Sequence, residues 1–365
     1  MKNHKPSLRK RIALNLFSKY TDAQAQLHEL SYLFWECTLR CNISCIHCGS
    51  DCRHDNRVKD MPYEDFIKVA QQVKAHYNPN KVMIVITGGE PLMRKDLEDC
   101  GMALKNLGFP WGFVTNGYAL TEERFEKLLN SGLRSMTISL DGFEQSHNWL
   151  RGNPHNFRKA TEAIKLAVGA GNRIVFDVAT CVNQRNFTEL EQLKLFLIEL
   201  GLKKWRLFSI CPIGRAKDNP ELSLTNQQFC KLLDFIKSGR GEKTIETSFG
   251  CEGFLGNYES EVREGFFFCR AGIHIASVLA DGSICACPNI DRAHFTQGSI
   301  YTDDFMDVWQ NRFSQMRKRA WTKEGLCADC DIFKWCKGNG IHLRDVENHD
   351  VLRCHYKMIK DAPDN

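Results

Sequence analysis

The stretch Ser31-Tyr-Leu-Phe-Trp-Glu36-Cys-Thr-Leu-Arg-Cys41-Asn-Ile-Ser-Cys45-Ile-His-Cys48-Gly49 joins a short apolar segment to a loop with three closely spaced cysteines. The apolar segment is typical of a buried strand. Three thiolates fit three corners of a [4Fe–4S] cube, and without a fourth ligand at matching spacing one iron stays open to a small molecule. A structural zinc site and buried hydrophobic cysteines are the alternatives. The neighbouring Cys37 and Cys52 leave the ligand count ambiguous.

Short apolar segments rich in β-branched residues recur along the chain with amphipathic segments between them. The pattern predicts strands at 31–36, 82–87, 111–115, 135–140, 173–180 and 205–210. It predicts helices at 63–76, 95–107, 122–131, 156–168, 187–200 and 227–237. Repeated βα units of this kind favour a parallel sheet with helices outside. Six units in place of eight predict an α/β fold in which the strands form an open, partial (β/α)6 barrel similar to a TIM barrel.

The periodicity weakens after about residue 240, and eight of the seventeen cysteines follow that point. A chain of 365 residues is long enough for one barrel and a smaller appended domain. We therefore expect an N-terminal extension at 1–30, a barrel at 31–240 and a cysteine-rich domain at 241–365.

The composition indicates a soluble globular protein, with 43% hydrophobic and 25% charged residues. The net charge of +5 is spread along the chain and is not interleaved with aromatic residues, which argues against nucleic-acid binding. No convincing export signal and no apolar run of membrane-spanning length is present. We expect a cytoplasmic protein with reduced thiols, and this favours metal ligands over disulfides.

Polar and glycine-rich motifs follow the predicted strands, where the reactive groups of a barrel gather. Gly88 and Gly89 let the backbone approach a ligand closely, and Glu90 can accept a hydrogen bond from an ammonium group. The hydroxyl of Ser139 and the carboxylate of Asp141 suit the hydroxyls of a ribose. Gly-Gly-Glu-Pro and Asp-Gly are also common in ordinary turns.

Taken together, the cysteine triad and these motifs resemble radical S-adenosylmethionine (SAM) enzymes. The resemblance implies a [4Fe–4S] cluster on Cys41, Cys45 and Cys48, whose open iron chelates the methionine amine and carboxylate of SAM. It implies that Gly88, Gly89 and Glu90 hold the methionyl amine. Further SAM contacts are expected from Asn116, Ser139, Asp141, Arg151 and Asn183. His47 is expected to pack beside the adenine and not to bind metal.

The C-terminal cysteines resemble the SPASM domain, which usually holds two auxiliary iron–sulfur clusters. The pattern is Cys269-x12-Gly282-x4-Cys287, then Cys327-x2-Cys330-x5-Cys336, then Cys354. The resemblance implies that Cys327, Cys330, Cys336 and Cys354 hold a complete second cluster; zinc on these four thiolates is the alternative. The first cluster keeps Cys269 and Cys287 but has Gly340 where the family has a cysteine. Cys285 or Cys251 can replace that ligand, so one or two auxiliary clusters are expected.

We therefore expect an enzyme that reductively cleaves SAM and abstracts hydrogen from a substrate, a peptide or protein side chain being the first choice. A small cofactor precursor is the alternative substrate, and a reductant such as flavodoxin or ferredoxin is the expected partner. A non-enzymatic electron carrier or a zinc-stabilised binding module is the alternative from another class. Sulfatase maturation is disfavoured, because Pro288 stands where those relatives have an acidic residue. About thirty residues precede the first strand, too few for a winged leader-binding domain.

Overall fold

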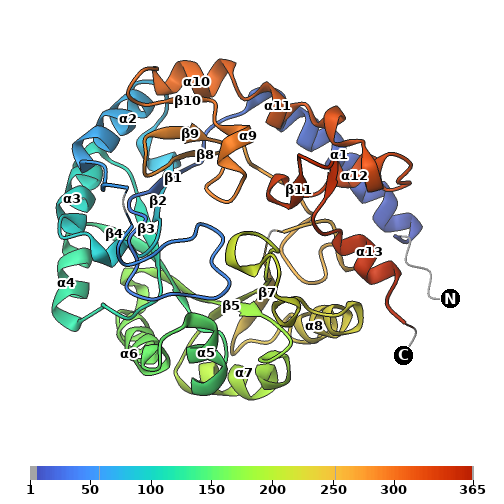
Figure 1. Ribbon diagram of the computed structural model, residues 1–365, viewed down its shortest axis with the longest axis horizontal. Helices are drawn as coiled ribbons and strands as arrows, with labels where there is room; N and C mark the ends of the chain where they lie inside the picture. The colour runs from blue at the N-terminus through green and yellow to red at the C-terminus, as the bar shows by residue number, and fades with distance from the viewer. Residues whose placement is uncertain (1–5, 57, 251, 364–365) are drawn as a thin grey trace.

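Seven parallel strands form the centre of the computed structural model, which describes residues 6–56, 58–250 and 252–363. Each strand pairs with the next along the chain, and together they curve around the middle of the molecule (Figure 1). The first six are predicted by the sequence, so the partial barrel is confirmed, and the seventh is an addition. The strands are β1 (Tyr32–Glu36), β2 (Met83–Thr87), β3 (Trp111–Thr115), β4 (Leu133–Ser139), β5 (Val175–Val182), β6 (Lys204–Ser209) and β7 (Glu246–Phe249).

Helices between the strands lie on the outer side of the curved sheet (Figure 1). They are α2 (Tyr63–His76), α3 (Leu97–Leu107), α4 (Glu122–Asn130), α5 (Glu144–Arg151), α6 (Asn156–Gly169), α7 (Leu190–Glu199) and α8 (Asn226–Ser238). All but α5 fall within two or three residues of the predicted helices. The short helix α5 is not predicted, because it makes only about two turns before Gly152 ends it.

Helix α2 shows why these segments form helices and bury one side. Phe66, Val69, Ala70 and Val73 recur at helical spacing, and all four are buried against the sheet. The ring of Phe66 stacks on Trp35 of β1 with the ring centroids 4.6 Å apart. An aromatic pair of this kind stabilises the fold by about 0.5–1.5 kcal/mol beyond the burial of its area.

The C-terminal part of the chain extends the same sheet on its other edge. β8 (Ile275–Val278) pairs in parallel with β1, and β9 (Ser283–Cys285) and β10 (Gly298–Ser299) follow in antiparallel order. The remaining elements are α9 (Arg292–Phe295), α10 (Phe305–Asn311), α11 (Ser314–Arg317), α12 (Phe333–Cys336), β11 (Arg344–Asp345), β12 (Asp350–Val351) and α13 (His355–Lys360). The proposed division near residue 240 falls between α8 and β7 and stays a prediction.

Helix α1 (Leu8–Leu27) begins the described chain and lies along the cysteine-rich C-terminal segment (Figure 1). Leu14 is buried in a small apolar cluster with Phe254 and Ile332. The Trp335 indole nitrogen donates to Oδ1 of Asn15 at 2.8 Å. The sequence pattern does not predict this helix, because its apolar residues are not confined to one side.

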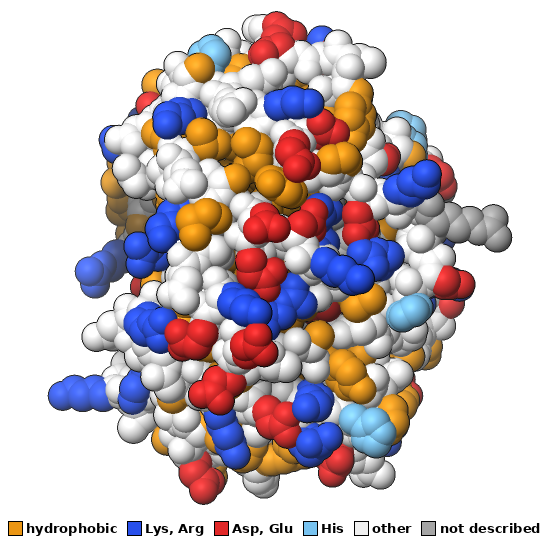
Figure 2. Space-filling view, turned by 90° about the vertical axis from the view of Figure 1, so that its left-hand side faces the viewer, with side chains coloured by type: hydrophobic (Ala, Val, Ile, Leu, Met, Phe, Trp, Pro, Cys, Tyr) orange, Lys and Arg blue, Asp and Glu red, His pale blue; other side chains and the backbone are white. Residues whose placement is uncertain are grey.

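Acidic and basic side chains are interspersed over the face that α2, α3 and α4 form (Figure 2). Within the described ranges, we find no helix that is both long enough and apolar enough to cross a membrane.

Candidate active site

A cavity of about 810 Å³ lies at the carboxyl ends of the strands. This size suits a bound small molecule. The cysteine loop and the strand-end loops line one side of it, and residues of the C-terminal part line the other. Of the predicted site residues, its lining includes Cys41, Cys45, Cys48, Gly88, Gly89, Asn116, Ser139 and Arg151. Glu90, Asp141 and Asn183 do not belong to that lining.

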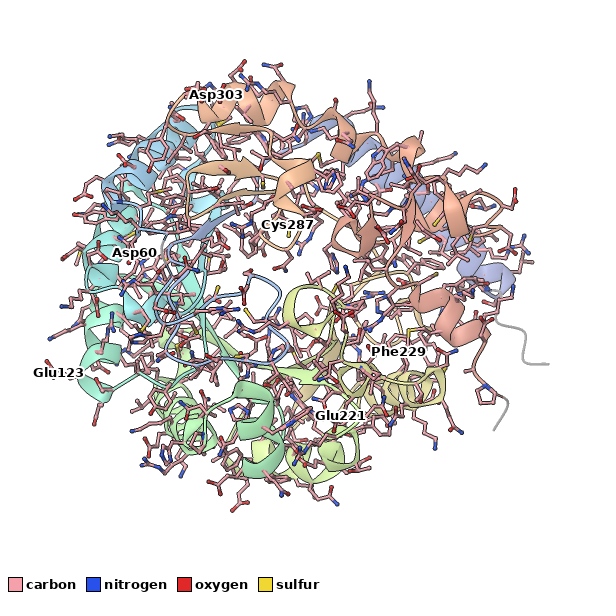
Figure 3. The ribbon with its side chains drawn as sticks, in the orientation of Figure 1. Asp60, Glu123, Glu221, Phe229, Cys287 and Asp303 are labelled. Atoms are coloured by element: carbon pink, nitrogen blue, oxygen red, sulfur yellow. The ribbon has the colours of Figure 1, made fainter. Side chains whose placement is uncertain are left out.

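The cysteine loop is held in shape by its own backbone and by a carboxylate at its base. The Cys41 amide donates to the Arg53 carbonyl at 3.0 Å, which closes the loop on itself. Asp60, labelled in Figure 3, accepts a hydrogen bond from Thr38 Oγ1 at 2.6 Å and pairs with the Arg40 guanidinium. The thiols are therefore presented by a closed loop.

The two glycines after β2 are needed because the cysteine loop passes directly over them. The Gly89 amide donates to the Thr38 carbonyl at 2.8 Å, and the Glu90 amide donates to the Arg40 carbonyl at 2.9 Å. A Cβ at position 88 would lie 2.2 Å from the Thr38 oxygen, and one at position 89 would lie 2.1 Å from the Arg40 oxygen. Gly88 also has a positive φ of 138°. The close approach therefore positions the cysteine loop as well as any ligand in the cavity.

The three thiols of the triad differ in their electrostatic surroundings. Burial raises the pKa of Cys41 to about 12. Burial also raises the pKa of Cys45, against the opposing effect of the Arg151 guanidinium, whose Nη1 lies 3.8 Å from Sγ. Contact with the Cys52 thiol lowers the pKa of Cys48, and Arg215 contributes in the same direction. A bound iron atom would deprotonate all three thiols.

Arg215 holds the far side of the cysteine loop, a role that sequence reasoning missed. Its Nε donates to the Cys45 carbonyl at 2.7 Å, and its amide donates to the Cys48 carbonyl at 3.1 Å. Its Nη1 donates to Asp51 Oδ1 at 2.7 Å. The stretch Pro212-Ile-Gly214-Arg215-Ala216 follows β6 in the sequence, but nothing local indicates that it meets the first loop of the barrel.

Glu90 lies behind the cavity lining and organises two strand-end loops. Its fully buried carboxylate accepts hydrogen bonds from Thr115 Oγ1 at 2.8 Å, from the Asn116 amide at 2.8 Å and from the Leu92 amide at 3.1 Å. Burial raises its pKa in spite of these donors. The structure thus shows a positioning role for Glu90; direct contact with SAM stays a prediction.

Asp141 and Arg151 form a buried ion pair beside the triad. Arg151 Nε donates to Asp141 Oδ2 at 2.6 Å, and the Cys181 amide donates to Oδ1 at 2.7 Å. Although burial alone would raise it, the pKa of Asp141 is held below its usual range by Arg151. Arg151 and Ser139 face the cavity, whereas the Asp141 carboxylate is enclosed.

The remaining predicted SAM contacts fall into two groups. Asn116 lines the cavity, and its Nδ2 donates to Asn42 Oδ1 at 2.8 Å. Asn183 is buried, and its Oδ1 accepts from the Arg185 amide at 2.9 Å, so it shapes the turn after β5. His47 lines the cavity with a buried Nδ1 that has no hydrogen-bond partner in the described structure.

The predicted second auxiliary set lies together at the α1 side of the molecule. Cys330, Cys336 and Cys354 pack against one apolar cluster that includes Phe254 and Tyr356. Burial raises the pKa of Cys336, and Cys354 adds to that effect. Nη1 of Arg344 lies 3.7 Å from Cys327 Sγ.

In the predicted first auxiliary set, the position that lacks a cysteine is closely packed. A Cβ at Gly340 would lie 2.7 Å from the Glu252 carbonyl oxygen and 2.7 Å from Cε1 of His342. Cys269 lies beside Arg319, which lowers its pKa although burial raises it. Cys287 lies near the middle of the molecule (Figure 3) and packs, partly buried, against the main apolar core. Cys285 is buried with Sγ 3.4 Å from Thr296 Oγ1, and Cys251 lies outside the described residues.

The donor set at the cavity fits a cubane cluster with SAM. In the ranges that the structure describes, no three Cys, His, Asp or Glu side chains surround the position of a single metal ion. A [4Fe–4S] cube binds each thiolate through a different iron, so its thiolates need not meet at one point. Cys41, Cys45 and Cys48 would hold the cluster, and the unpartnered His47 nitrogen offers a polar contact to a molecule beside it. When bound, the reduced cluster and SAM supply a 5′-deoxyadenosyl radical.

Comparisons with known proteins agree with this arrangement. Residues 35–197 match the model of the radical SAM superfamily, and residues 269–331 match that of the SPASM iron–sulfur cluster-binding domain. The chain is 24% identical to the AdoMet-dependent heme synthase of Methanosarcina barkeri, over 83% of this chain and 89% of that protein. It is 28% identical to the mycofactocin maturase MftC of Mycobacterium tuberculosis, over 84% and 77%.

Two solved structures share the fold. Streptococcus suis SuiB bound to the precursor peptide SuiA matches with a TM-score of 0.66 and 18% identity, over 94% of this chain and 76% of that one. Native anSMEcpe with bound AdoMet and the Cp18Cys peptide matches with a TM-score of 0.68 and 20% identity, over 91% and 95%. The family models, the barrel and the cysteine sets agree, and the chain is a radical SAM enzyme with a C-terminal SPASM domain.

Proposed function

We propose that this enzyme abstracts hydrogen from a side chain of a peptide or protein that enters the cavity from the C-terminal side. The observation that carries the proposal is the outer wall of the cavity, where residues of the C-terminal part with both signs of charge belong to the lining. They are Asp291, Arg292, Asp345 and Glu347. Such a wall suits the polar backbone and mixed side chains of a peptide.

The names of similar proteins support this choice of substrate. The mycofactocin relative is a maturase, and SuiB and anSMEcpe are both described with bound peptides. Similarity to a heme synthase supports a small cofactor precursor as the alternative substrate. A low-potential carrier such as flavodoxin or ferredoxin would supply the electron, and the need for reduced thiols fits the cytoplasm.

The chain's own residues prepare the site for that reaction. Arg215 and the glycines after β2 fix the cysteine loop, and Arg151 places a positive charge beside Cys45. Ser139, Asn116 and His47 present polar groups to SAM at the cavity wall. Glu90 and Asp141 would position these contacts from behind.

Deuterium transfer tests the proposal with a mixture of peptides in place of a single substrate. Reconstituted enzyme, SAM and dithionite are incubated with a perdeuterated tryptic peptide pool from the host proteome, and 5′-deoxyadenosine is analysed by mass spectrometry. We expect deuterium in the product with the peptides and none without them. Stimulation by iron coproporphyrin III, with no deuterium from peptides, would contradict a peptide substrate.

A matched pair of charge reversals sharpens the test. Glu347→Lys changes an exposed residue of the cavity lining. Glu123→Lys changes an exposed position on α4 that is not part of that lining and lies at the outer edge of the molecule (Figure 3). We expect Glu347→Lys to reduce deuterium transfer and to leave substrate-free SAM cleavage unchanged. Glu123→Lys should affect neither reaction.

A further inference from the structure

A fourth cysteine lies beside the triad, in the same loop and facing the same cavity. Cys52 is only 3% exposed, and it lines the cavity together with Cys41, Cys45 and Cys48. All four belong to one small apolar group. The spacing of the four is C-x3-C-x2-C-x3-C, so all four lie within one stretch of twelve residues, 41–52.

The Cys52 thiol contacts the Cys48 thiol, and both residues belong to the same small cluster beside the cavity. Arg215 Nη1 donates to the Cys52 carbonyl at 3.2 Å and to Asp51 Oδ1 at 2.7 Å. These bonds tie the loop down at Cys52, whose thiol also lies 3.9 Å from the Ser50 carbonyl oxygen.

Ordinary burial of a small hydrophobic side chain does not account for this placement. Cys37, close to the same loop, is an example of ordinary burial: it is fully buried and does not belong to the cavity lining. Its surroundings are Arg94 and Cys100, on the helix side of the sheet. Cys52 differs because its thiol reaches both a cluster ligand and the space where a ligand of the open iron would bind.

We propose that Cys52 is an exchangeable fourth thiolate, which binds the open iron of the cluster when SAM is absent and is displaced when SAM binds. The exchange breaks one iron–sulfur bond and forms bonds from the same iron to the amine and carboxylate of SAM. The released thiolate takes up a proton, and no electron is transferred. This inference rests on the radical SAM site and is independent of the substrate proposed above.

Mössbauer spectroscopy of ⁵⁷Fe-reconstituted protein tests the ligation directly. Wild type and Cys52→Ala are compared without and with SAM, and the auxiliary clusters cancel in the difference spectra. We expect Cys52→Ala without SAM to show an iron subsite with a non-sulfur ligand, which wild type shows only after SAM is added. Identical spectra for the two proteins in both states would overturn the proposal.

SAM affinity supplies a second readout. If Cys52 occupies the open iron in nine of ten SAM-free molecules, its removal should tighten SAM binding by about tenfold. Cys37→Ala is the matched control and should leave the SAM dissociation constant unchanged. Equal affinity of wild type and Cys52→Ala would also overturn the proposal.

A third variant is needed in case Cys52→Ala loses its iron–sulfur cluster. If Cys52→Ala fails to retain iron, Cys52→Ser repeats both measurements with a smaller change of side chain. Loss of the cluster there too would show that Cys52 is a fixed ligand, which contradicts an exchangeable one.

Discussion

The cysteine loop of the barrel and the four cysteines Cys327, Cys330, Cys336 and Cys354 of the C-terminal part, here called the quartet, use similar residues in different surroundings. Each places one arginine against a thiol: Arg151 Nη1 lies 3.8 Å from Cys45 Sγ, and Arg344 Nη1 lies 3.7 Å from Cys327 Sγ. The barrel cysteines line a cavity of about 810 Å³. Cys336 of the quartet lines a cavity of only about 70 Å³.

The difference shows which property separates a site for chemistry from a site for structure. The barrel loop is fixed by backbone contacts and by Arg215, which leaves the thiol side free for a ligand. Cys330, Cys336 and Cys354 of the quartet pack against an apolar cluster to which helix α1 contributes Leu14. Metal binding at such a closed site contributes directly to folding.

The largest effect should come from the barrel triad. Cys41→Ala, Cys45→Ala or Cys48→Ala should each abolish reductive SAM cleavage, because each removes a ligand of the cluster with the open iron. The melting temperature should change little, because the loop is held by contacts other than the thiols. Production of 5′-deoxyadenosine under dithionite measures the loss. Undiminished production in any one variant would show that the substituted cysteine is not a required cluster ligand.

Loss of a quartet ligand should act on folding first. Cys327→Ala and Cys336→Ala should lower solubility and iron content together, because ligation and folding are coupled at this site. Cys285→Ala, at a buried position on β9, is the control and should have a milder effect. Iron and sulfide are counted in the Cys41/Cys45/Cys48→Ala background, where we expect one secure auxiliary cluster. Two fully cysteine-ligated clusters there would show that another residue replaces the cysteine missing at Gly340.

The two arginines beside the thiols should differ in their contribution to stability. Arg151→Ala leaves the Asp141 carboxylate fully buried and unpaired, and it should cost about 3–5 kcal/mol of unfolding free energy. Arg344→Ala should cost less, because its partner Glu324 keeps a side chain that is 30% exposed. Urea denaturation of the two variants measures both values. Equal losses would show that burial of the partner is not what separates them.

The smallest effect should come from the residue behind the cavity wall. Glu90→Ala should weaken SAM binding by about 1.5–3 kcal/mol while the iron content of the first cluster stays nearly intact. The reason is that Thr115 and the Asn116 amide lose the acceptor that positions them. Titration calorimetry with SAM gives the affinity. Asp141→Ala should also weaken SAM binding. Unchanged SAM affinity in both variants would show that the two motifs are ordinary turns.

Local sequence patterns predict most of the barrel but only part of the site. Helix α2 is predicted with its observed bounds, because Phe66, Val69 and Val73 mark one side of a helix within a single segment. Helix α1 is not predicted, since its contacts with α12 join residues about 320 positions apart. Glu90 and Asp141 are predicted to touch a ligand because they follow strands. Both carboxylates instead lie behind the cavity lining, because they bind hydrogen-bond donors from other parts of the chain.

The sequence by itself determined the order of βα units, the family and the cysteines available as ligands, because hydrophobic period and ligand spacing are local properties. Only the tertiary structure decided which polar groups face the cavity and which support it. It also placed Arg215 under the cysteine loop and Cys52 beside Cys48. The physical reason is that a polar side chain takes its role from its hydrogen-bond partners, and in this protein those partners come from distant parts of the chain.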